Sequence, residues 1–132
     1  MTDINLAYIV EDDTIACYVI QMELSRHSEY HKNEAFKNGE EALEALKKCA
    51  DQSKCLPDLI LLDINMPIMD GWEFLDEFSN LTYSKDISVI ILTSSINPED
   101  REKAKKYKDV KGFMSKPITK DKLDQILDLI KV

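Results

Sequence analysis

Acidic, hydroxyl and ammonium side chains follow four separate apolar runs in this chain. In chain order they are Glu11 and Asp12, Asp63, Thr93 and Lys116. If the apolar runs are parallel strands of one sheet, their carboxyl ends share one rim, and these side chains lie close together there. Each has an ordinary explanation when taken alone, such as a helix cap for the acids or a turn for Thr93. Their combination instead predicts a site for phosphoryl transfer to a carboxylate.

The chemistry of this set divides between a cation and an anion. Clustered carboxylates repel one another unless a cation compensates them, and an all-oxygen site favours Mg²⁺. The metal would leave Asp63 ionised as a nucleophile. The Lys116 ammonium would bind one phosphoryl oxygen, the Thr93 hydroxyl would donate to another, and the small Ser94 would leave room for the group.

Alternating patterns predict the elements that must position these residues. Short apolar or β-branched runs predict strands at 4–10, 30–36, 59–62, 87–92 and 110–114. The run 59–62, bounded by Pro57 and Pro67, is typical of a strand buried on both faces, whereas the more polar run 30–36 fits a sheet edge.

Helical spacing fills the segments between these runs. The first helix would be capped by Asp13 or Thr14, and the last by Thr119. The apolar residues expected to face the core are Ile15, Ala16, Val19, Ile20 and Leu24; Ala42, Leu43 and Leu46; Trp72, Phe74, Leu75 and Phe78; and Leu123, Ile126, Leu127 and Ile130. Asn97-Pro98 would open the fourth helix. Strands alternating with helices predict an α/β fold with a doubly wound parallel sheet covered on both faces.

Composition predicts one domain over residues 1–132, with no effector domain. The chain has 132 residues, 44% of them hydrophobic, and a net charge of −8, which argues against direct nucleic-acid binding. We find no apolar run of membrane-spanning length and no secretory leader, so we expect a cytoplasmic protein with no membrane association. The three cysteines, Cys17, Cys49 and Cys55, have no paired metal spacing and are expected to be reduced thiols. His27 and His31 are expected to be structural.

Four segments resemble the receiver domain of two-component response regulators, in the order typical of the single-domain, chemotaxis-regulator-like members. They are VEDD at 10–13, DLILLDINMPIMDGWEF at 58–74, ILTSS at 91–95 and GFMSKPI at 112–118. This combination is highly specific, and the resemblance covers essentially the whole chain.

The resemblance implies a role for each matching residue. Asp63 would be the phosphoacceptor, and Glu11 and Asp12 the acidic pair that holds Mg²⁺, with Asp12 binding directly and Glu11 through water. The backbone carbonyl of Asn65 would also bind the metal, and Thr93 and Lys116 would bind the phosphoryl group. Phe113 would be an aromatic switch residue coupled to Thr93. The resemblance also implies a cis Lys116-Pro117 peptide. The implied fold is flavodoxin-like, with three layers, strand order 2-1-3-4-5 and five flanking helices.

The implied function is that of a stand-alone response regulator in a phosphorelay. It would accept a phosphoryl group from a phosphohistidine on a sensor histidine kinase or a histidine phosphotransfer domain, and then switch a face that binds a downstream protein. Such a protein is not a conventional enzyme, although it catalyses its own phosphorylation and dephosphorylation. It would be a monomer or a weak homodimer. A basic run, comprising Arg101, Lys103, Lys105, Lys106, Lys108 and Lys111, is either an output surface for an acidic partner or a solvated helix face.

Three features depart from the family pattern. The segment 51–56 makes a longer link into the third strand than receivers commonly have, and Asp109-Val110 replaces a frequent Gly-Ala. Asn65 and Ser95 occupy flanking positions that can influence hydrolysis, so the phosphoryl lifetime is left open.

Two alternatives remain. A haloacid-dehalogenase-like phosphatase also uses an Asp nucleophile, but it needs a second Asp where this chain has Asn65, and it places its acidic pair after the nucleophile. A degenerate receiver could also serve purely as a scaffold, although the full acceptor set is present here.

Overall fold

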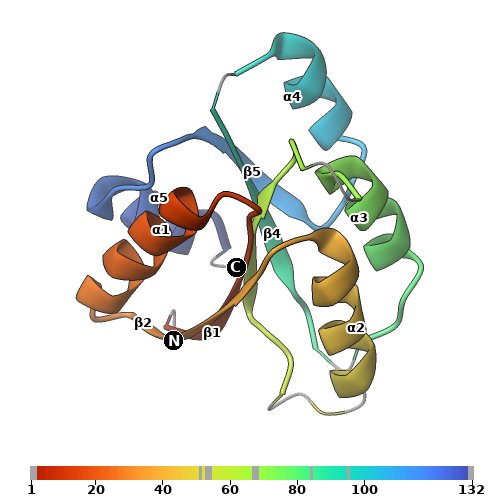
Figure 1. Cartoon of the computed structure of the whole chain (residues 1–132), viewed down its shortest axis with the longest axis horizontal. Coiled ribbons are helices and arrows are strands. Elements are labelled where there is room, and N and C mark those ends of the chain that lie inside the picture. Colours follow the sequence, from red (N-terminus) through yellow and green to blue (C-terminus); the bar gives the residue numbers. More distant parts are fainter. Residues whose placement is uncertain are drawn as a thin grey trace.

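The chain folds as a parallel sheet between two layers of helices (Figure 1). The computed structural model describes residues 3–50, 52, 55–66, 69–83, 85–94 and 96–130. The elements are β1 Ile4–Val10, α1 Thr14–Arg26, β2 Tyr30–Phe36, α2 Gly39–Cys49, β3 Leu59–Asp63, α3 Gly71–Ser79, β4 Ser88–Thr93, α4 Pro98–Ala104, β5 Val110–Ser115 and α5 Lys120–Ile130. The five strands lie in the order β2-β1-β3-β4-β5, which confirms the predicted flavodoxin-like fold.

Two hydrophobic clusters, one on each face of the sheet, form the core. Helices α2, α3 and α4 contribute to one cluster, and α1 and α5 to the other. Strand β3 supplies both, because Ile60 and Leu62 pack on the first side while Leu59 and Leu61 pack on the second. All four are at most 1% exposed, as predicted for a strand buried on both faces. Burial on both sides leaves β3 little freedom, so the position of Asp63 at its end is fixed.

Strand β2 lies at the sheet edge, as its polar sequence predicts. It pairs only with β1, and most of its side chains are exposed. Its first residue, Tyr30, is buried and donates its hydroxyl hydrogen to the Leu123 carbonyl oxygen of α5 at 2.7 Å. This bond ties the edge strand to the helix that covers the neighbouring face.

Polar caps begin the helices at the positions that the sequence indicates. Asp13 Oδ1 accepts from the backbone N–H groups of Ile15 and Ala16, at 2.9 and 3.2 Å. Asn97 caps α4 directly before Pro98, and Thr119 Oγ1 accepts from the Lys122 N–H at 3.3 Å at the start of α5. The caps satisfy backbone donors that would otherwise have no partner.

The predicted inward face of α1 is partly wrong. Ile20 and Leu24 are buried, but Ile15 is 76% exposed and Val19 is 38% exposed. At 3.6 residues per turn, Ile15 lies roughly 140° around the helix from Ile20, so both cannot face the sheet. Ile15, Tyr18 and Val19 form an exposed apolar strip, which we call the α1 strip.

The prediction of three reduced cysteines is also wrong for two of them. Cys49 and Cys55 form a disulfide, with their Cα atoms 5.4 Å apart, whereas Cys17 is free. The pairing depends on backbone hydrogen bonds from the Cys55 and Leu56 N–H groups to the Gln52 carbonyl oxygen, which the spacing alone does not show.

Both histidines have protein partners. Buried His27 lies 2.7 Å from Asp124 of α5, and His31 lies 2.9 Å from Asp3. Neither belongs to a potential metal-ligand cluster within the described ranges, in line with the predicted structural role. In the part of the chain that the structure describes, no helix combines the length and apolar character that crossing a bilayer requires.

Gly71 brings α3 against the segment that follows Asp63. Its N–H donates to the Ile64 carbonyl oxygen at 3.2 Å. A Cβ atom at this position would lie 2.6 Å from the Ile64 Cα, which is backbone and cannot move aside by a rotamer change. Only glycine, which has no Cβ atom, therefore fits at this position.

We expect Gly71→Ala to lower the free energy of unfolding by about 1–3 kcal/mol, because the helix or the Ile64 backbone must shift. Urea denaturation measures this change. The matched control is Gly39→Ala, whose Cβ would meet only side-chain atoms of Phe74 and Met69 at 3.0 Å or more, so the loss should be smaller. Equal losses in the two variants would contradict this explanation.

Candidate functional site

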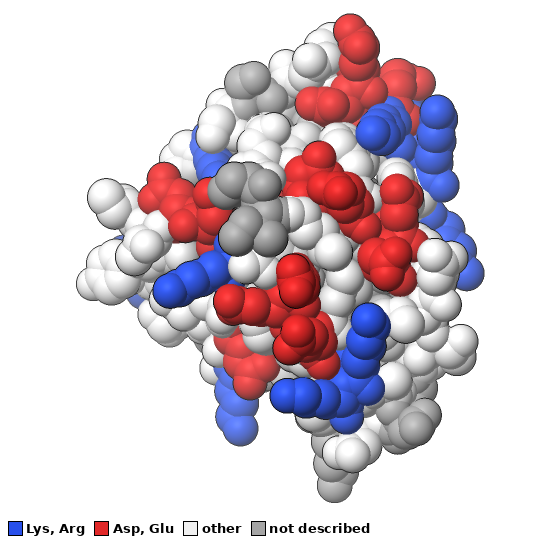
Figure 2. Space-filling model, turned by 45° about the vertical axis from the view of Figure 1, so that its right-hand side comes forward, with Lys and Arg blue, Asp and Glu red and all other residues white. Residues whose placement is uncertain are grey.

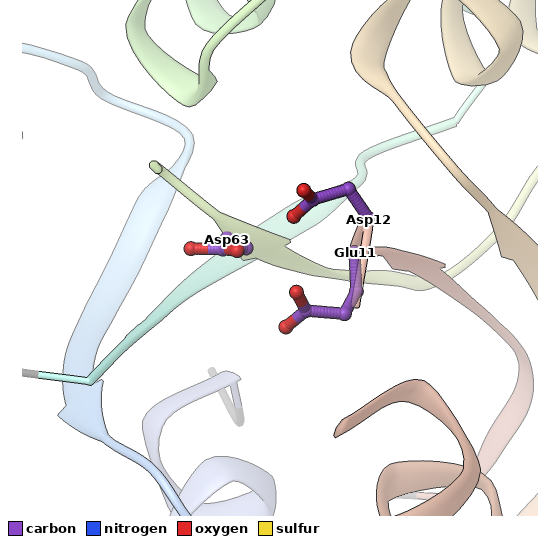
Figure 3. A group of neighbouring side chains, drawn as sticks. All are labelled: Glu11, Asp12 and Asp63. Carbon is purple, nitrogen blue, oxygen red and sulfur yellow. The ribbon is translucent and has the colours of Figure 1, made fainter. Parts of the chain in front are cut away.

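Three carboxylates meet at the carboxyl end of two adjacent strands. Glu11 and Asp12 directly follow β1, and Asp63 is the last residue of β3, which pairs with β1 in parallel. Ligand oxygens from all three lie within 4.8 Å of one another. Figure 3 shows the Glu11 and Asp12 side chains leaving the end of β1 on the side where Asp63 lies. The structure thus brings together the acids that the sequence places 51 residues apart, counting from Asp12 to Asp63.

Backbone donors hold two of these carboxylates in place. The Asn65 N–H donates to Asp63 Oδ1 at 3.0 Å, and the Asp13 N–H donates to Glu11 Oε2 at 3.2 Å. Asp63 is 5% exposed and Glu11 is 4% exposed, whereas Asp12 is exposed at the mouth of the site. The site therefore has two buried acids and one that faces solvent.

Lys116 supplies the positive charge. Its backbone N–H donates to the Thr93 carbonyl oxygen at 2.8 Å, which fixes the residue just beyond β5. Its Nζ lies 2.5 Å from Glu11 Oε1 and 3.5 Å from Asp63 Oδ2. The Lys116-Pro117 peptide is cis, as the resemblance implies. The ammonium group thus lies between the two buried acids, closer to Glu11.

Burial and charge together shift the acid–base properties of this group. Burial raises the pKa of Glu11 to about 7, with Asp63 adding to the rise and Lys116 opposing it. Burial alone would lower the pKa of Lys116, but the nearby Glu11 and Asp63 carboxylates outweigh it and raise that pKa above its usual value. When all are ionised, three carboxylates and one ammonium leave two formal negative charges. That excess suits a divalent cation.

The donor set also fits Mg²⁺. Among the described residues, Glu11 Oε1 is a buried side-chain oxygen without a geometrically defined hydrogen bond, and the Lys116 ammonium lies beside it as an ion-pair partner. All candidate ligand atoms are oxygens, and Asp12 offers one on the solvent side, where waters could complete the coordination.

The other predicted residues lie on β4, on β5 or just after the strands. Thr93 ends β4 and is 1% exposed, next to β5 through its pairing with Ser115. Phe113 is half-buried in β5, with the Arg101 guanidinium 5.7 Å from its ring centre. Asn65 and Ser94 are exposed. Ser95 lies outside the described residues, as do Pro67 and Ile68 of the central motif.

The sequence profile of the response regulator receiver domain matches residues 7–128. The chain belongs to this family. It spans 79% of the length of the first of its curated relatives, to which it is 27% identical, but only 6–16% of several longer ones.

Solved structures agree with the family assignment. A two-component response regulator from Cytophaga hutchinsonii is 26% identical, with a TM-score of 0.87 over 96% of each chain. The phosphorylated cyanobacterial phytochrome response regulator RcpA is 31% identical, with a TM-score of 0.74 over 93% of this chain and 88% of that one. The Mn²⁺-bound response regulator Rcp1, of Synechocystis, is 27% identical, with a TM-score of 0.74 over 95% of this chain and 91% of that one.

Two backbone N–H contacts contribute to the site without having been predicted. Asp13, expected only as a helix cap, also holds Glu11 through its backbone N–H. The backbone N–H of Asn65 holds Asp63. Main-chain donors carry no residue-specific signal, so the sequence could not have indicated either contact.

Replacing Lys116 by Met should lower the free energy of unfolding by about 1–3 kcal/mol in the presence of EDTA. The physical reason is that two buried carboxylates lose the cation that compensates them. Guanidinium denaturation measures the change.

Lys120→Met is the matched control. Lys120 pairs with Asp124 at 3.0 Å, but its side chain is 75% exposed, so its loss should leave the free energy of unfolding nearly unchanged. A Lys116→Met protein as stable as wild type would show that Lys116 does not compensate the acidic group.

Proposed function

We propose that this receiver domain accepts a phosphoryl group on Asp63 and acts as a stand-alone response regulator in a phosphorelay. The observation that carries the proposal is the buried Asp63 carboxylate with Lys116 Nζ at 3.5 Å and two further acids beside it. The phosphorylated state of the similar RcpA structure supports it. The domain would span residues 1–132.

The residues of the site suit an in-line displacement. An Asp63 oxygen attacks the phosphorus of a phosphohistidine, an O–P bond forms, the P–N bond breaks, and the imidazole leaves and takes up a proton. Asn65 N–H and Lys116 stabilise the negative charge around Asp63. Lys116 and the Thr93 hydroxyl then hold the transferred group. Hydrolysis of the acyl phosphate by water would reset the domain, so its catalysis acts on itself and not on a released product.

Mg²⁺ is the proposed cofactor. Glu11, Asp12, Asp63 and the Asn65 backbone carbonyl would hold it, and it would neutralise charge on the incoming phosphoryl group. The divalent ion in the similar Rcp1 structure supports a metal requirement.

The α1 strip is a candidate docking surface for the phosphoryl donor. Val19 of this strip also lines a small apolar groove of ~120 Å³. Ile20, Lys116 and Pro117 are among the other residues that line the groove. A sensor histidine kinase or a histidine phosphotransfer domain would cover this apolar surface while presenting its phosphohistidine to Asp63. We place the exchange in the cytoplasm.

Thr93 and Phe113 are the proposed switch between the site and an output face formed by α4, β5 and α5. Thr93 would move toward the phosphoryl group, and Phe113 would fill the space that it leaves. Arg101 over the Phe113 ring links such a movement to α4. Helix α4 is also held to α3, because Trp72 stacks on Tyr107 at 6.0 Å and Lys103 lies 4.7 Å from the Trp72 ring centre.

The basic run on and after α4 would meet an acidic partner. On the face shown in Figure 2, Asp and Glu gather in several groups, with Lys and Arg mainly around them. One of its members is already paired, since Lys105 Nζ lies 2.7 Å from Glu102. The output would pass to a downstream protein, without direct nucleic-acid binding, from a monomer or a weak homodimer.

Acetyl phosphate with Mg²⁺ should add one phosphoryl group that is stable in acid and labile in base, as measured by intact mass. Asp63→Asn should abolish the adduct because the nucleophile is gone, while Asp121→Asn, an exposed substitution at the start of α5, should keep it. Phosphate that persists in Asp63→Asn would rule out the proposal, as would the absence of any adduct on wild type.

The switch has a separate optical test. Phosphorylation should change the fluorescence of Trp72, because a moving α4 alters the Tyr107 and Lys103 contacts of that ring. Thr93→Val keeps the buried volume but removes the hydroxyl, so the adduct should still form by mass while the fluorescence change is lost. A full fluorescence change in phosphorylated Thr93→Val would contradict the assigned role of Thr93.

A further inference from the structure

We propose that Cys49 and Cys55 form a reversible thiol–disulfide modification site. It would be oxidised by small-molecule disulfides and reduced by small-molecule thiols. The oxidised pair would link the end of α2 covalently to the segment that precedes β3. This site lies apart from the acceptor site and does not depend on the proposed function.

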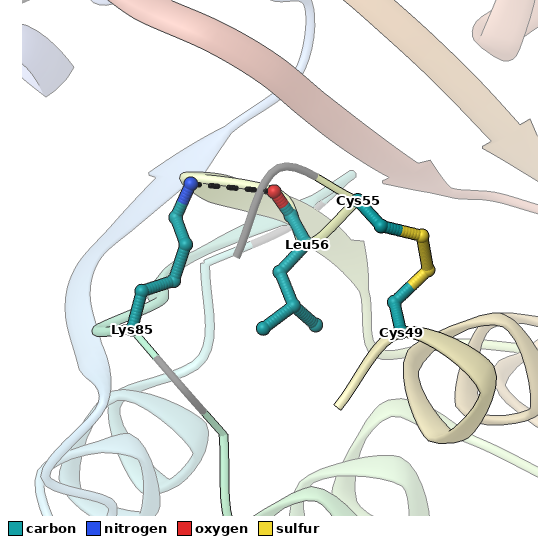
Figure 4. The surroundings of a disulfide bond; sticks show 4 residues. All are labelled: Cys49, Cys55, Leu56 and Lys85. Atoms are coloured by element: carbon teal, nitrogen blue, oxygen red, sulfur yellow. Dashed lines mark hydrogen bonds between the residues drawn. A yellow bond between two sulfur atoms is a disulfide. The ribbon is translucent and has the colours of Figure 1, made fainter. Parts of the chain in front are cut away.

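The fold brings the two sulfur atoms together by placing one on a helix end and the other in a turn. Cys49 is the last residue of α2, and Cys55 lies in the turn that leads into β3 (Figure 4). The turn is closed by backbone hydrogen bonds, from the Gln52 N–H to the Cys49 carbonyl oxygen at 2.8 Å and from the Cys55 N–H to the Gln52 carbonyl oxygen at 2.9 Å. The Cα separation of 5.4 Å is within the range of protein disulfides.

The segment after Cys55 is anchored independently of the disulfide. Lys85 Nζ donates to the Leu56 carbonyl oxygen at 3.3 Å and lies 2.6 Å from Asp58 Oδ1. Asp58 Oδ2 in turn accepts from the backbone N–H groups of Asn5 and Leu6, at 2.8 and 3.3 Å. These contacts would hold Cys55 near its position in both redox states. The reduced pair could therefore form the disulfide again without a large rearrangement of the backbone.

An open groove gives reagents access to the pair. Its volume is ~750 Å³, and residues of β1, β2 and α2 line it together with both cysteines. Lys32 and Lys48 are in this lining and would attract an anionic reagent, although Glu34 opposes them. Cys55 is half-buried, whereas Cys49 is 7% exposed. Cys55 is therefore the sulfur that a reagent meets first, and Cys49 is the one that resolves.

The exchange balances with one molecule of disulfide oxidant. The Cys55 thiolate attacks a sulfur of the oxidant, an S–S bond forms between them, and one thiol leaves. The Cys49 thiolate then displaces the second thiol from Cys55 and forms the protein disulfide. Two protein thiols are oxidised, one small disulfide is reduced to two thiols, and the two protons end on those thiols.

We expect the Cys49–Cys55 disulfide to change the stability of the folded domain and not the phosphoryl transfer at Asp63. Cys55 precedes β3, and Asp63 is the last residue of that strand, so the pair and the acceptor lie at opposite ends of the sheet. Closing the loop reduces the conformational freedom of the unfolded chain and so stabilises the folded domain.

The protein is incubated with oxidised glutathione or with dithiothreitol, then denatured and alkylated with iodoacetamide, and its intact mass is measured. We expect one alkylated thiol, Cys17, after oxidation, and three after reduction, with dithiothreitol reversing the oxidised result. The oxidised form should melt about 5–10 °C higher than the reduced form.

Variants separate the effect of the disulfide from a general effect of oxidant. Cys17→Ala should keep the melting shift, while Cys49→Ser and Cys55→Ser should each lose it. Three alkylated thiols after oxidation would overturn the proposal, as would a stable glutathione adduct with no protein disulfide, or equal melting temperatures of the two wild-type forms. The number of alkylated thiols on wild type still tests the proposal if a serine variant folds poorly.

Discussion

Electrostatic repulsion among Glu11, Asp12 and Asp63 is the constraint on which the site depends. Two of these carboxylates are buried, and burial without compensation is unfavourable. Lys116 compensates part of the charge from within the chain, at 2.5 Å from Glu11 and 3.5 Å from Asp63. The remaining negative charge favours a divalent cation, and such a cation would in turn favour the proposed phosphoryl group.

The sheet makes this arrangement possible. Since all five strands are parallel, residues that end β1, β3, β4 and β5 reach the same rim. The double-sided burial of β3 fixes Asp63, and the bond from Lys116 N–H to the Thr93 carbonyl oxygen fixes the lysine. The opposite rim has different contacts, centred on Asp58, Lys85 and the Cys49–Cys55 pair. One end of β3 therefore carries Asp63, the proposed acceptor, and the other end carries the contacts of Asp58 and Lys85.

Much of this could be predicted, because the signals are local. The β-branched run at 4–10 matches β1 residue for residue, and the strand order follows from the family resemblance. The acidic residues were predicted to converge because strand ends share a rim. Three findings required tertiary information. Helical periodicity marks Ile15 as apolar but does not say which side of α1 meets the sheet. The spacing of Cys49 and Cys55 does not reveal the turn that brings them together, and nothing in the sequence shows that Lys116 lies closer to Glu11 than to Asp63.

The central claim is that Asp63, and no neighbouring acid, carries the phosphoryl group. Borohydride reduction of the phosphorylated protein converts an aspartyl phosphate to homoserine, which peptide mass spectrometry can locate. We predict homoserine at position 63 alone, dependent on Mg²⁺. Reduction products at Glu11 or Asp12, or an unmodified Asp63 in protein that carries phosphate, would contradict this account.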